Sequence, residues 1–584
     1  MRATLVMLIL LVTGSLTTAL IRPALPSPGI ESAITYFKSE APSFANSCQT
    51  LQSAVKTIGI HDPRSIATAR QKLADCRYAY KKMESFLEYF FTTSARIYNR
   101  APKFEAEEPS MEYQSPIGLQ VIESLLYEKI TPESKQQLQE QTAAVVSSST
   151  DLVSLLYGLQ ADDRQLLESL RIELVRIVAL DITGYEAPFL KSGIRESYAA
   201  LQSIDRQLQP YLIKGEPRSD SLRYFLQKAL DGLRDHPAFD SFDRLQFLRS
   251  AALPLQHQLN LLIRQRGLTL AASPILNYEA KNIFSPDALI PQHFPGAYRT
   301  DSATIASGHT LFFDKGLSGN GSRSCATCHA PEKFFTDGLP TSLAIDGHSA
   351  LPRNAPTLLY CGLQYQQFWD GRAASLEQQI RTVLQNSREM RAPDSVIQHI
   401  DTIAKAIAAY VSSLHPMNSA FDKYIETGGP TLTTREINGA NLFLGKAQCA
   451  TCHFIPLFNG LIPPDYTRTE YEVLGTTRTD QFNKPQLSPD SGRFVVYPFP
   501  FYKGAFKTPT VRNTAKTAPY MHNGAFHSLQ KVLDFYNKGG GEGMGLAIPS
   551  QTLSAHPLGL SPREEQDIIL FLNTLTDSLP PINK

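Results

Sequence analysis

The pentapeptide CATCH stands at residues 325–329 and again at residues 449–453. Two cysteines separated by two residues can reach the two vinyl groups of one porphyrin, and the next residue then places an imidazole beneath the iron. The duplicated pentad therefore predicts two covalently bound c-type haems. The expected attachment cysteines and proximal iron ligands are Cys325, Cys328, His329, Cys449, Cys452 and His453.

Two other kinds of site also use Cys-x-x-Cys pairs. A zinc ribbon takes four ligands, which the two pairs could supply together. A thioredoxin-like redox pair needs a βαβ context. Zinc does not need a histidine after the second cysteine in both copies, and no βαβ pattern surrounds either pentad. Both observations favour haem.

The sequence around the pentads repeats as well. Leu311-Phe312-Phe313 precedes the first pentad, and Leu442-Phe443-Leu444 precedes the second. Phe335-Thr336-Asp337-Gly338 follows the first, and Phe458-Asn459-Gly460 follows the second. This similarity predicts two copies of one small haem-binding unit.

The N-terminal half has helical periodicity. Apolar residues recur at helical spacing, for example at Leu167, Leu170 and Leu174, and no useful strand alternation is present. We therefore predict a mainly α protein in which a helical bundle at 30–284 is joined by a Pro-rich linker at 285–300 to two cytochrome c-like domains. These domains are expected at 301–430 and at 431–580.

The first 20 residues have the pattern of an export signal. Arg2 precedes a short apolar run at 5–12, and small residues follow. A signal peptide or an N-terminal anchor at 1–20 would place the protein in the periplasm, where c-type haem is attached and disulfides persist. We leave open a disulfide between Cys48 and Cys76, and we expect Cys361 to be a buried free thiol.

The chain of 584 residues carries 56 Lys and Arg against 55 Asp and Glu, a net charge of +1. This balance does not point to nucleic acid as a partner. Near the C-terminus, Met521 and His522 are both candidates for the sixth iron position, and a methionine ligand would raise the haem potential. Trp369 is the only tryptophan, and a lone tryptophan is most often a core anchor.

Further runs occur in a fixed order from about residue 300 to residue 580. They are Leu311–Asp314, Leu317–Ser322, Phe335–Gly338, Arg353–Thr357, Phe368–Arg372, Asn386–Met390, Phe506–Thr510 and Ala518–Gly524. Together with the pentads, this series resembles bacterial dihaem cytochrome c peroxidases and their MauG-type relatives. The resemblance covers about half of the chain.

The resemblance implies roles for individual residues. The haem on His329 would be peroxidatic, and the haem on His453, with Met521 as its second ligand, would receive electrons. Trp369 matches the tryptophan between the haems. Glu389 matches a distal carboxyl that can act as both base and acid on peroxide, and Gln379 matches a pocket glutamine.

Other matches are less regular. Asn354 matches a ligand of a calcium ion between the haem units, and His348 lies near the histidine that blocks the peroxidatic iron until the other haem is reduced. The family run Asn-Pro-x-Glu-Met has Ser387 in place of its proline. MauG-type proteins carry tyrosine where Met521 stands, which favours the peroxidase.

We therefore expect reduction of hydrogen peroxide to water with electrons from a small cytochrome c or cupredoxin, and a homodimer is one possible oligomeric state. The alternatives are a MauG-type oxidase that modifies a protein partner and a non-catalytic dihaem electron carrier. In the N-terminal half, Gly118–Glu123 faintly resembles the Gly-x-His-x-x-Glu run of imelysin-like proteins, with Gln120 in place of the histidine. An ordinary amphipathic helix explains the same run.

Overall fold

A computed structural model describes residues 28–107, 111–271, 275–295, 301–429 and 431–579. The expected signal or anchor at 1–20 lies outside the described residues. Within the described part of the chain, helices predominate in both halves, which confirms the mainly α class. No helix there is long and apolar enough to cross a membrane.

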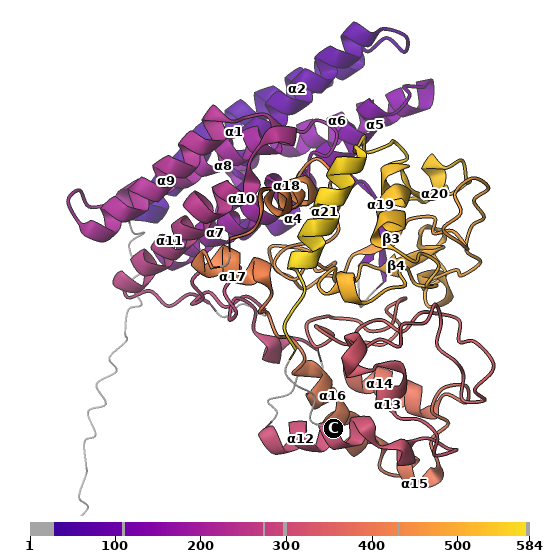
Figure 1. Cartoon of the computed structure of the whole chain (residues 1–584). Coiled ribbons are helices and arrows are strands. Elements are labelled where there is room, and N and C mark those ends of the chain that lie inside the picture. The colour runs from indigo at the N-terminus through magenta and orange to yellow at the C-terminus, as the bar shows by residue number, and fades with distance from the viewer. Residues whose placement is uncertain (1–27, 108–110, 272–274, 296–300, 430, 580–584) are drawn as a thin grey trace, which may run out of the picture.

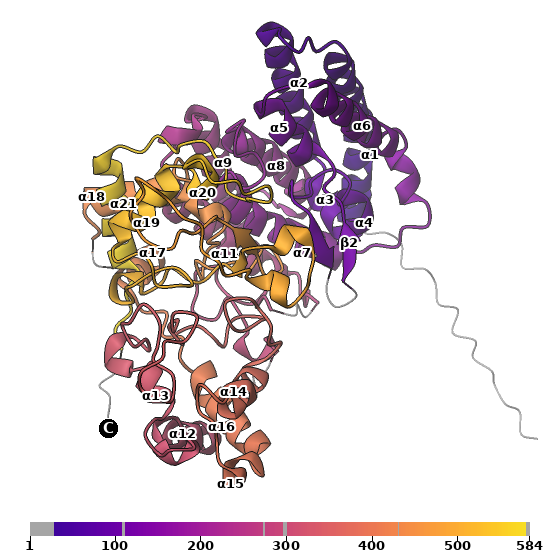
Figure 2. The ribbon, with the colours of Figure 1, turned by 90° about the vertical axis from the view of Figure 1, so that its right-hand side faces the viewer.

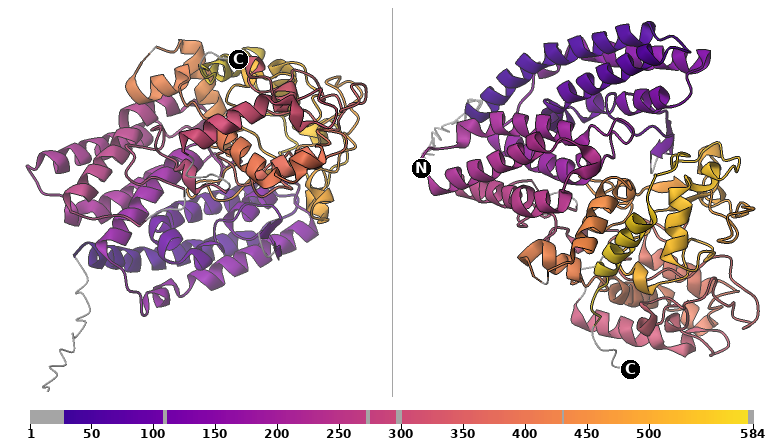
Figure 3. Two further views of the ribbon diagram at one scale, coloured as in Figure 1. Left: turned by 90° about the horizontal axis from the view of Figure 1, so that it is seen from below. Right: turned by 45° about the horizontal axis from the view of Figure 1, so that its top comes forward.

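The N-terminal half is a bundle of long helices, seen at the top of Figure 1 and in the right-hand view of Figure 3. Its helices are α1 (Pro28–Lys56), α2 (Pro63–Lys81), α3 (Glu84–Phe90), α4 (Thr92–Ala95), α5 (Leu119–Tyr127), α6 (Pro132–Ser149), α7 (Asp163–Arg176), α8 (Gly193–Leu208), α9 (Pro217–Asp235), α10 (Arg244–Phe247) and α11 (Leu253–Gln265).

Helix α7 lies inside this bundle. Its apolar residues Leu167, Leu170 and Leu174 are buried, as their spacing predicts. Glu168 and Arg171 are buried too, so α7 is covered on more than one face. The helix continues into a π-helical turn at Ile177–Asp181.

A buried ionic cluster ties this turn to α2. The ammonium of Lys81 lies 2.7 Å from a carboxylate oxygen of Glu84, 2.7 Å from Asp181 and 2.6 Å from Glu186. All four residues are buried. Lysine is almost never fully buried unless it is paired, so three carboxylates around one ammonium are what allow Lys81 to sit in the core.

The two cysteines of the bundle lie close together. The sulfur atoms of Cys48 on α1 and Cys76 on α2 lie 3.5 Å apart as free thiols in the core.

The Gly118–Glu123 run belongs to α5. The buried Glu123 accepts hydrogen bonds from the backbone N–H groups of Phe189 (2.8 Å) and Leu190 (2.7 Å). Gln120 donates to the side chain of Asn99, so the Gly118–Glu123 run takes part in packing and internal hydrogen bonding.

The bundle also contains a short hairpin that the sequence did not predict. Strands β1 (Glu105–Glu107) and β2 (Glu112–Gln114) pair antiparallel. Each has only three residues, too few to display a period of two. The segment from Leu276 to Phe294 is anchored to the bundle, where Arg171 donates to the carbonyl of Ala280 (3.0 Å) and the N–H of Ile283 donates to Gln256 (3.1 Å). Of the expected linker, residues 296–300 lie outside the described residues.

The C-terminal half consists of short helices joined by long irregular segments (Figures 1 and 2). Its elements are α12 (Ser302–Phe313), α13 (Cys325–Cys328), α14 (Leu376–Gln385), α15 (Asp394–Ile397), α16 (Ile400–Ser412), α17 (Ala420–Thr427), α18 (Thr434–Leu444), β3 (Tyr471–Val473), β4 (Ala505–Lys507), α19 (Leu529–Asn537), α20 (Gly540–Gly543) and α21 (Pro562–Thr574). Helix α12 packs on α16, and α18 packs on α21.

The bundle packs closely against the segment that leads into the second pentad. Arg244 is fully buried and donates to the backbone carbonyls of Ile182 (2.6 Å), Phe242 (3.1 Å) and Phe239 (2.8 Å). Its guanidinium lies directly against Gly445, where an added Cβ would be 2.3 Å from Arg244 Cζ. The two halves thus share a continuous hydrophobic core.

Candidate haem sites

Each pentad forms one tight turn. The N–H of His329 donates to the carbonyl of Cys325 at 3.0 Å, and the N–H of His453 donates to the carbonyl of Cys449 at 3.0 Å. The equal hydrogen bonds show that both copies place two thiols and an imidazole on the same kind of turn. Burial raises the pKa of Cys325 and of Cys449 to about 12, so both are neutral thiols at pH 7.

Both imidazoles are oriented for a metal. His329 Nδ1 lies 3.1 Å from the carbonyl oxygen of Phe335, and His453 Nδ1 lies 3.0 Å from that of Pro509. A carbonyl only accepts, so each Nδ1 carries the proton and each Nε2 keeps a free lone pair, the usual arrangement of a metal-bound histidine. Burial lowers the pKa of both rings, that of His453 to about 4, which keeps them neutral.

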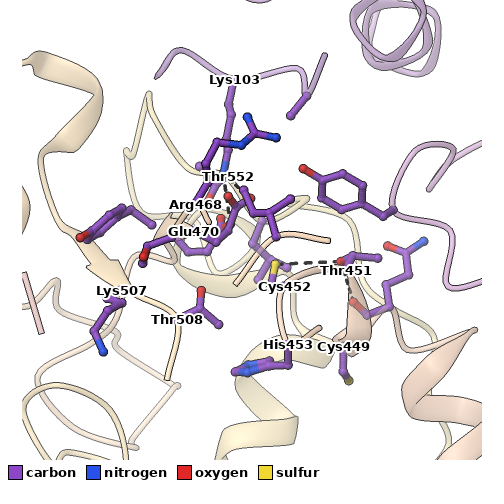
Figure 4. A pocket seen from close by; sticks show the side chains of 18 of the residues that line it. Lys103, Cys449, Thr451, Cys452, His453, Arg468, Glu470, Lys507, Thr508 and Thr552 are labelled. Atoms are coloured by element: carbon purple, nitrogen blue, oxygen red, sulfur yellow. Dashed lines mark hydrogen bonds and ion pairs between the residues drawn. The ribbon is translucent and has the colours of Figure 1, made fainter. Parts of the chain in front are cut away.

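A large cavity adjoins the second pentad, with a volume of about 1810 Å³. Ligand pockets usually measure ~300–1,000 Å³. Cys449, Cys452 and His453 line it together with Met521, and part of its wall comes from the bundle. Figure 4 shows the pentad side chains on one side of this cavity and Lys507 on the other. The cavity is therefore large enough for a porphyrin.

Of the two candidates for the sixth position, His522 is engaged elsewhere. Its ring stacks on Phe506 with a centroid distance of 3.7 Å, and its Nε2 lies 3.2 Å from Ser488 Oγ. Met521 is half-buried and has a φ of 70°, in the left-handed region that is uncommon for residues other than glycine. Such strain concentrates at functional sites, so the geometry favours Met521.

Lys507 is a half-buried cation within the Phe506–Thr510 run, and the resemblance gave it no role. Its Nζ hydrogen-bonds to the neutral amide oxygen of Gln364 and, among the described residues, makes no ion pair with a carboxylate. Loss of contact with water lowers its pKa to about 8. A half-buried ammonium without an ion-pair partner on a cavity wall favours an anionic group in that cavity, and a haem carries two propionates.

Trp369 lies where the two haem units meet. Its indole N–H donates to the carbonyl of Asn354 at 3.0 Å, and its own carbonyl accepts from the backbone N–H of Lys507 at 2.8 Å. Trp369 therefore joins a segment of the first unit to a strand of the second and borders the cavity. Asn354 in turn donates from Nδ2 to the carbonyl of Leu339 at 2.9 Å and from its backbone N–H to that of His522 at 2.8 Å.

At the first pentad, the carboxylate of Glu389 lies within electrostatic reach of Cys328. Glu389 is half-buried, and its Oε1 accepts from Asn386 Nδ2 at 2.8 Å. Burial raises its pKa, while Arg372 and the Asn386 hydrogen bond act in the opposite direction. Its charge in turn helps to raise the pKa of Cys328, which places the two groups within electrostatic reach.

The remaining predicted site residues are less well placed. Gln379 is half-buried on α14. His348 is exposed in a turn whose backbone N–H groups bond to Asp346. A ligand role for His348 would require this turn to move, and that role stays a prediction.

Comparison with known proteins agrees with this arrangement. A family model described as di-haem cytochrome c peroxidase matches residues 302–403. Cytochrome-c peroxidase IdrP1 of Pseudomonas sp. (strain SCT) is 32% identical over 363 residues, which are 55% of this chain and 93% of that protein. The chain belongs to the dihaem cytochrome c peroxidase family.

Other members of this family are similar to a comparable extent. Cytochrome-c peroxidase IdrP2 of Denitromonas iodatirespirans is 30% identical, over 50% of this chain and 86% of that protein. Methylamine utilization protein MauG of Methylorubrum extorquens is 31% identical, over 46% of this chain and 77% of that protein.

As a dihaem peroxidase of this family, the protein is an oxidoreductase. The residues present fit two haems: two neutral thiol pairs, two imidazoles with free Nε2 atoms, a large cavity at the second pentad and a half-buried lysine without an ion-pair partner. The family implies peroxide as substrate and a redox partner. Sequence reasoning assigned Lys507 no role although it lies in the Phe506–Thr510 run, and the bundle residues in the cavity wall were missed because no local motif marks them.

Proposed function

We propose that this protein reduces hydrogen peroxide to two water molecules, using two protons and two electrons from a small cytochrome c or cupredoxin. The observation that carries the proposal is the difference between the two haem sites. A half-buried carboxyl, Glu389, lies within electrostatic reach of Cys328 in the first pentad. A thioether, Met521, borders the same cavity as the second.

The haems would be attached through the four pentad cysteines, with His329 and His453 as proximal ligands. When bound, they supply the redox centres at which peroxide is cleaved and electrons are received. Lys507 would pair with a haem propionate, which would neutralise the ammonium. Met521 would complete the second site and favour its reduced state.

Glu389 would handle the protons. It takes a proton from one peroxide oxygen and delivers it to the other, which leaves as water. Asn386 holds the carboxyl in place through the 2.8 Å hydrogen bond. Trp369 would carry electrons between the two units, and its bonded contacts with Asn354 and Lys507 support that role. Gln379 would contribute to the pocket from α14.

The proposal includes a calcium ion. Asn354 lies among the carbonyls of Leu339, Pro340 and His522, which supports a calcium site of oxygen ligands between the two units. Removal of calcium by a chelator should lower the melting temperature and the peroxidase rate together.

The proposal also includes the domain limits and the location of the protein. The domain limits would be 30–284, 301–430 and 431–580, with 285–300 as linker. The protein would be exported to the periplasm.

The proposal can be tested on the purified holoprotein. Its mass after acid–acetone extraction should exceed that of the processed chain by two haem groups, and a mass with one haem, none or zinc would refute covalent attachment. Peroxide turnover should then be measured in the fully oxidised and the half-reduced forms, with a reduced small cytochrome as donor.

The MauG relative gives the second candidate a basis. A MauG-type oxidase would show slow peroxide turnover with the donor and would oxidise a protein partner when peroxide is added. Two six-coordinate haems without any reaction with peroxide would instead support an electron carrier.

A further inference from the structure

Lys103 is a residue of the N-terminal bundle that reaches into the second haem site. It lies just before β1, and its Nζ pairs with Glu470 and lies 3.4 Å from Glu472 Oε1. Figure 4 shows it extending from the bundle toward Glu470, with Cys452 nearby. The side chains of Lys103, Glu470 and Glu472 are only 19%, 5% and 9% exposed.

These charges face the second pentad. Lys103, Glu470 and Glu472 line the same cavity as Cys452 and His453. A haem held in this cavity would therefore lie within reach of their charges. Because the site is buried, water and salt screen these interactions only weakly.

The cluster is not neutral. Its carboxylates are Glu105, Glu470 and Glu472, and its cations are Lys103 and Arg468. With all five ionised, the net charge is −1, and without Lys103 it would be −2. Burial raises the pKa of Glu470 to about 8, although Lys103 opposes that rise, so Glu470 carries its full charge only above pH 8, where the potentials are to be compared. Lys103 is the cation that pairs directly with both Glu470 and Glu472.

We propose that Lys103, contributed by the N-terminal bundle, raises the reduction potential of the haem held by Cys449, Cys452 and His453. This inference rests on the proposed function, which places a haem there. Reduction adds an electron to the haem, so a nearby cation favours the reduced form and nearby carboxylates oppose it. The bundle is then part of the electron-accepting site rather than an appended domain.

The test is a spectroscopic potential titration of the purified full-length holoprotein. Lys103→Met should shift the potential of the second haem downward and leave that of the first unchanged. Lys103→Arg should keep the wild-type value because it keeps the charge. Glu470→Gln, which removes an opposing charge, should shift the potential upward, and combining it with Lys103→Met should return the potential toward the wild type.

Lys82→Met is the matched control. Lys82 is another bundle lysine with a carboxylate partner, Glu40 at 3.3 Å, and it is not among the residues that line the cavity. It should leave both potentials unchanged. An equal shift in the two lysine variants would overturn the inference, because the effect would then come from general loosening of the bundle.

Different results would refute the proposed function and the role of Lys103. A holoprotein without two haem transitions would refute the proposed function itself. Two transitions with the same potentials in the wild type and in Lys103→Met would refute only the role of Lys103. If Lys103→Met does not fold, Glu470→Gln still decides, since an unchanged potential in that variant overturns the inference.

Discussion

Replacing Glu389 by glutamine separates proton transfer from everything else in the first haem site. Glutamine has the same shape and keeps an oxygen that can accept the hydrogen bond from Asn386, now 2.8 Å long. It cannot take up a proton. The loop should therefore keep its conformation, and both haems should still be incorporated and reduced.

The expected loss is one of rate. A positioned general acid–base group contributes ~10²–10⁴-fold, and each tenfold corresponds to 1.36 kcal/mol of activation free energy. Loss of proton transfer by Glu389 should thus raise the barrier by about 2.7–5.4 kcal/mol. The assay is the initial rate of peroxide consumption by the half-reduced enzyme with a saturating chemical donor.

The pH dependence gives a second signature. Burial raises the pKa of Glu389 above its ordinary value of 4.5. The base must be deprotonated to accept a proton, so the wild-type rate should fall as the pH drops through this raised pKa. The glutamine variant should lack that limb of the profile.

Glu332→Gln is the control, because Glu332 is an exposed carboxylate a few residues after the same pentad. It should keep the full rate. If Glu389→Gln also keeps the full rate with both haems present, Glu389 is a partly buried surface charge and the proposed acid–base chemistry is wrong.

Four other variants test the remaining parts of the site and fold. Met521→Ala should lower the potential of the second haem and abolish its thioether absorption band, whereas His522→Ala should leave that band; the opposite pattern would reassign the ligand. Gly445→Ala would place a Cβ 2.3 Å from Arg244 Cζ, and because three carbonyls hold that guanidinium, we expect a cost of ~1–3 kcal/mol and a disturbed second haem. An unchanged melting temperature and spectrum would mean that this contact relaxes freely. Lys81→Met removes the ion-pair partner of the buried Glu84 and Asp181, while Glu186 keeps Arg77, so denaturant unfolding should show a loss of ~3–5 kcal/mol. That loss should shrink at low pH, where the carboxylates are protonated, and a loss independent of pH would contradict the charge argument.

The chemistry of the two haem sites was largely predictable because its parts are local. Within each pentad, the two thiols and the imidazole lie on one turn closed by a 3.0 Å hydrogen bond. Five consecutive residues therefore specify an attachment site whatever surrounds them. The helical periodicity of the first half is local too, and the buried residues of α7 follow it.

The tertiary structure decided which charges face these sites. Lys103 and Glu470 are 367 residues apart in the sequence, and Lys507 and Gln364 are 143 apart. Sequence patterns treat such residues as solvated surface charges, since lysine and glutamate are usually exposed. The packing of the bundle against the second unit buries Lys103 beside Glu470, and the packing of the two haem units against each other brings Lys507 to Gln364. The sequence by itself predicted that two haems are bound and where they would be attached, whereas the fold determined the electrostatic environment of the second site, because burial and long-range contacts set the strength of a charge.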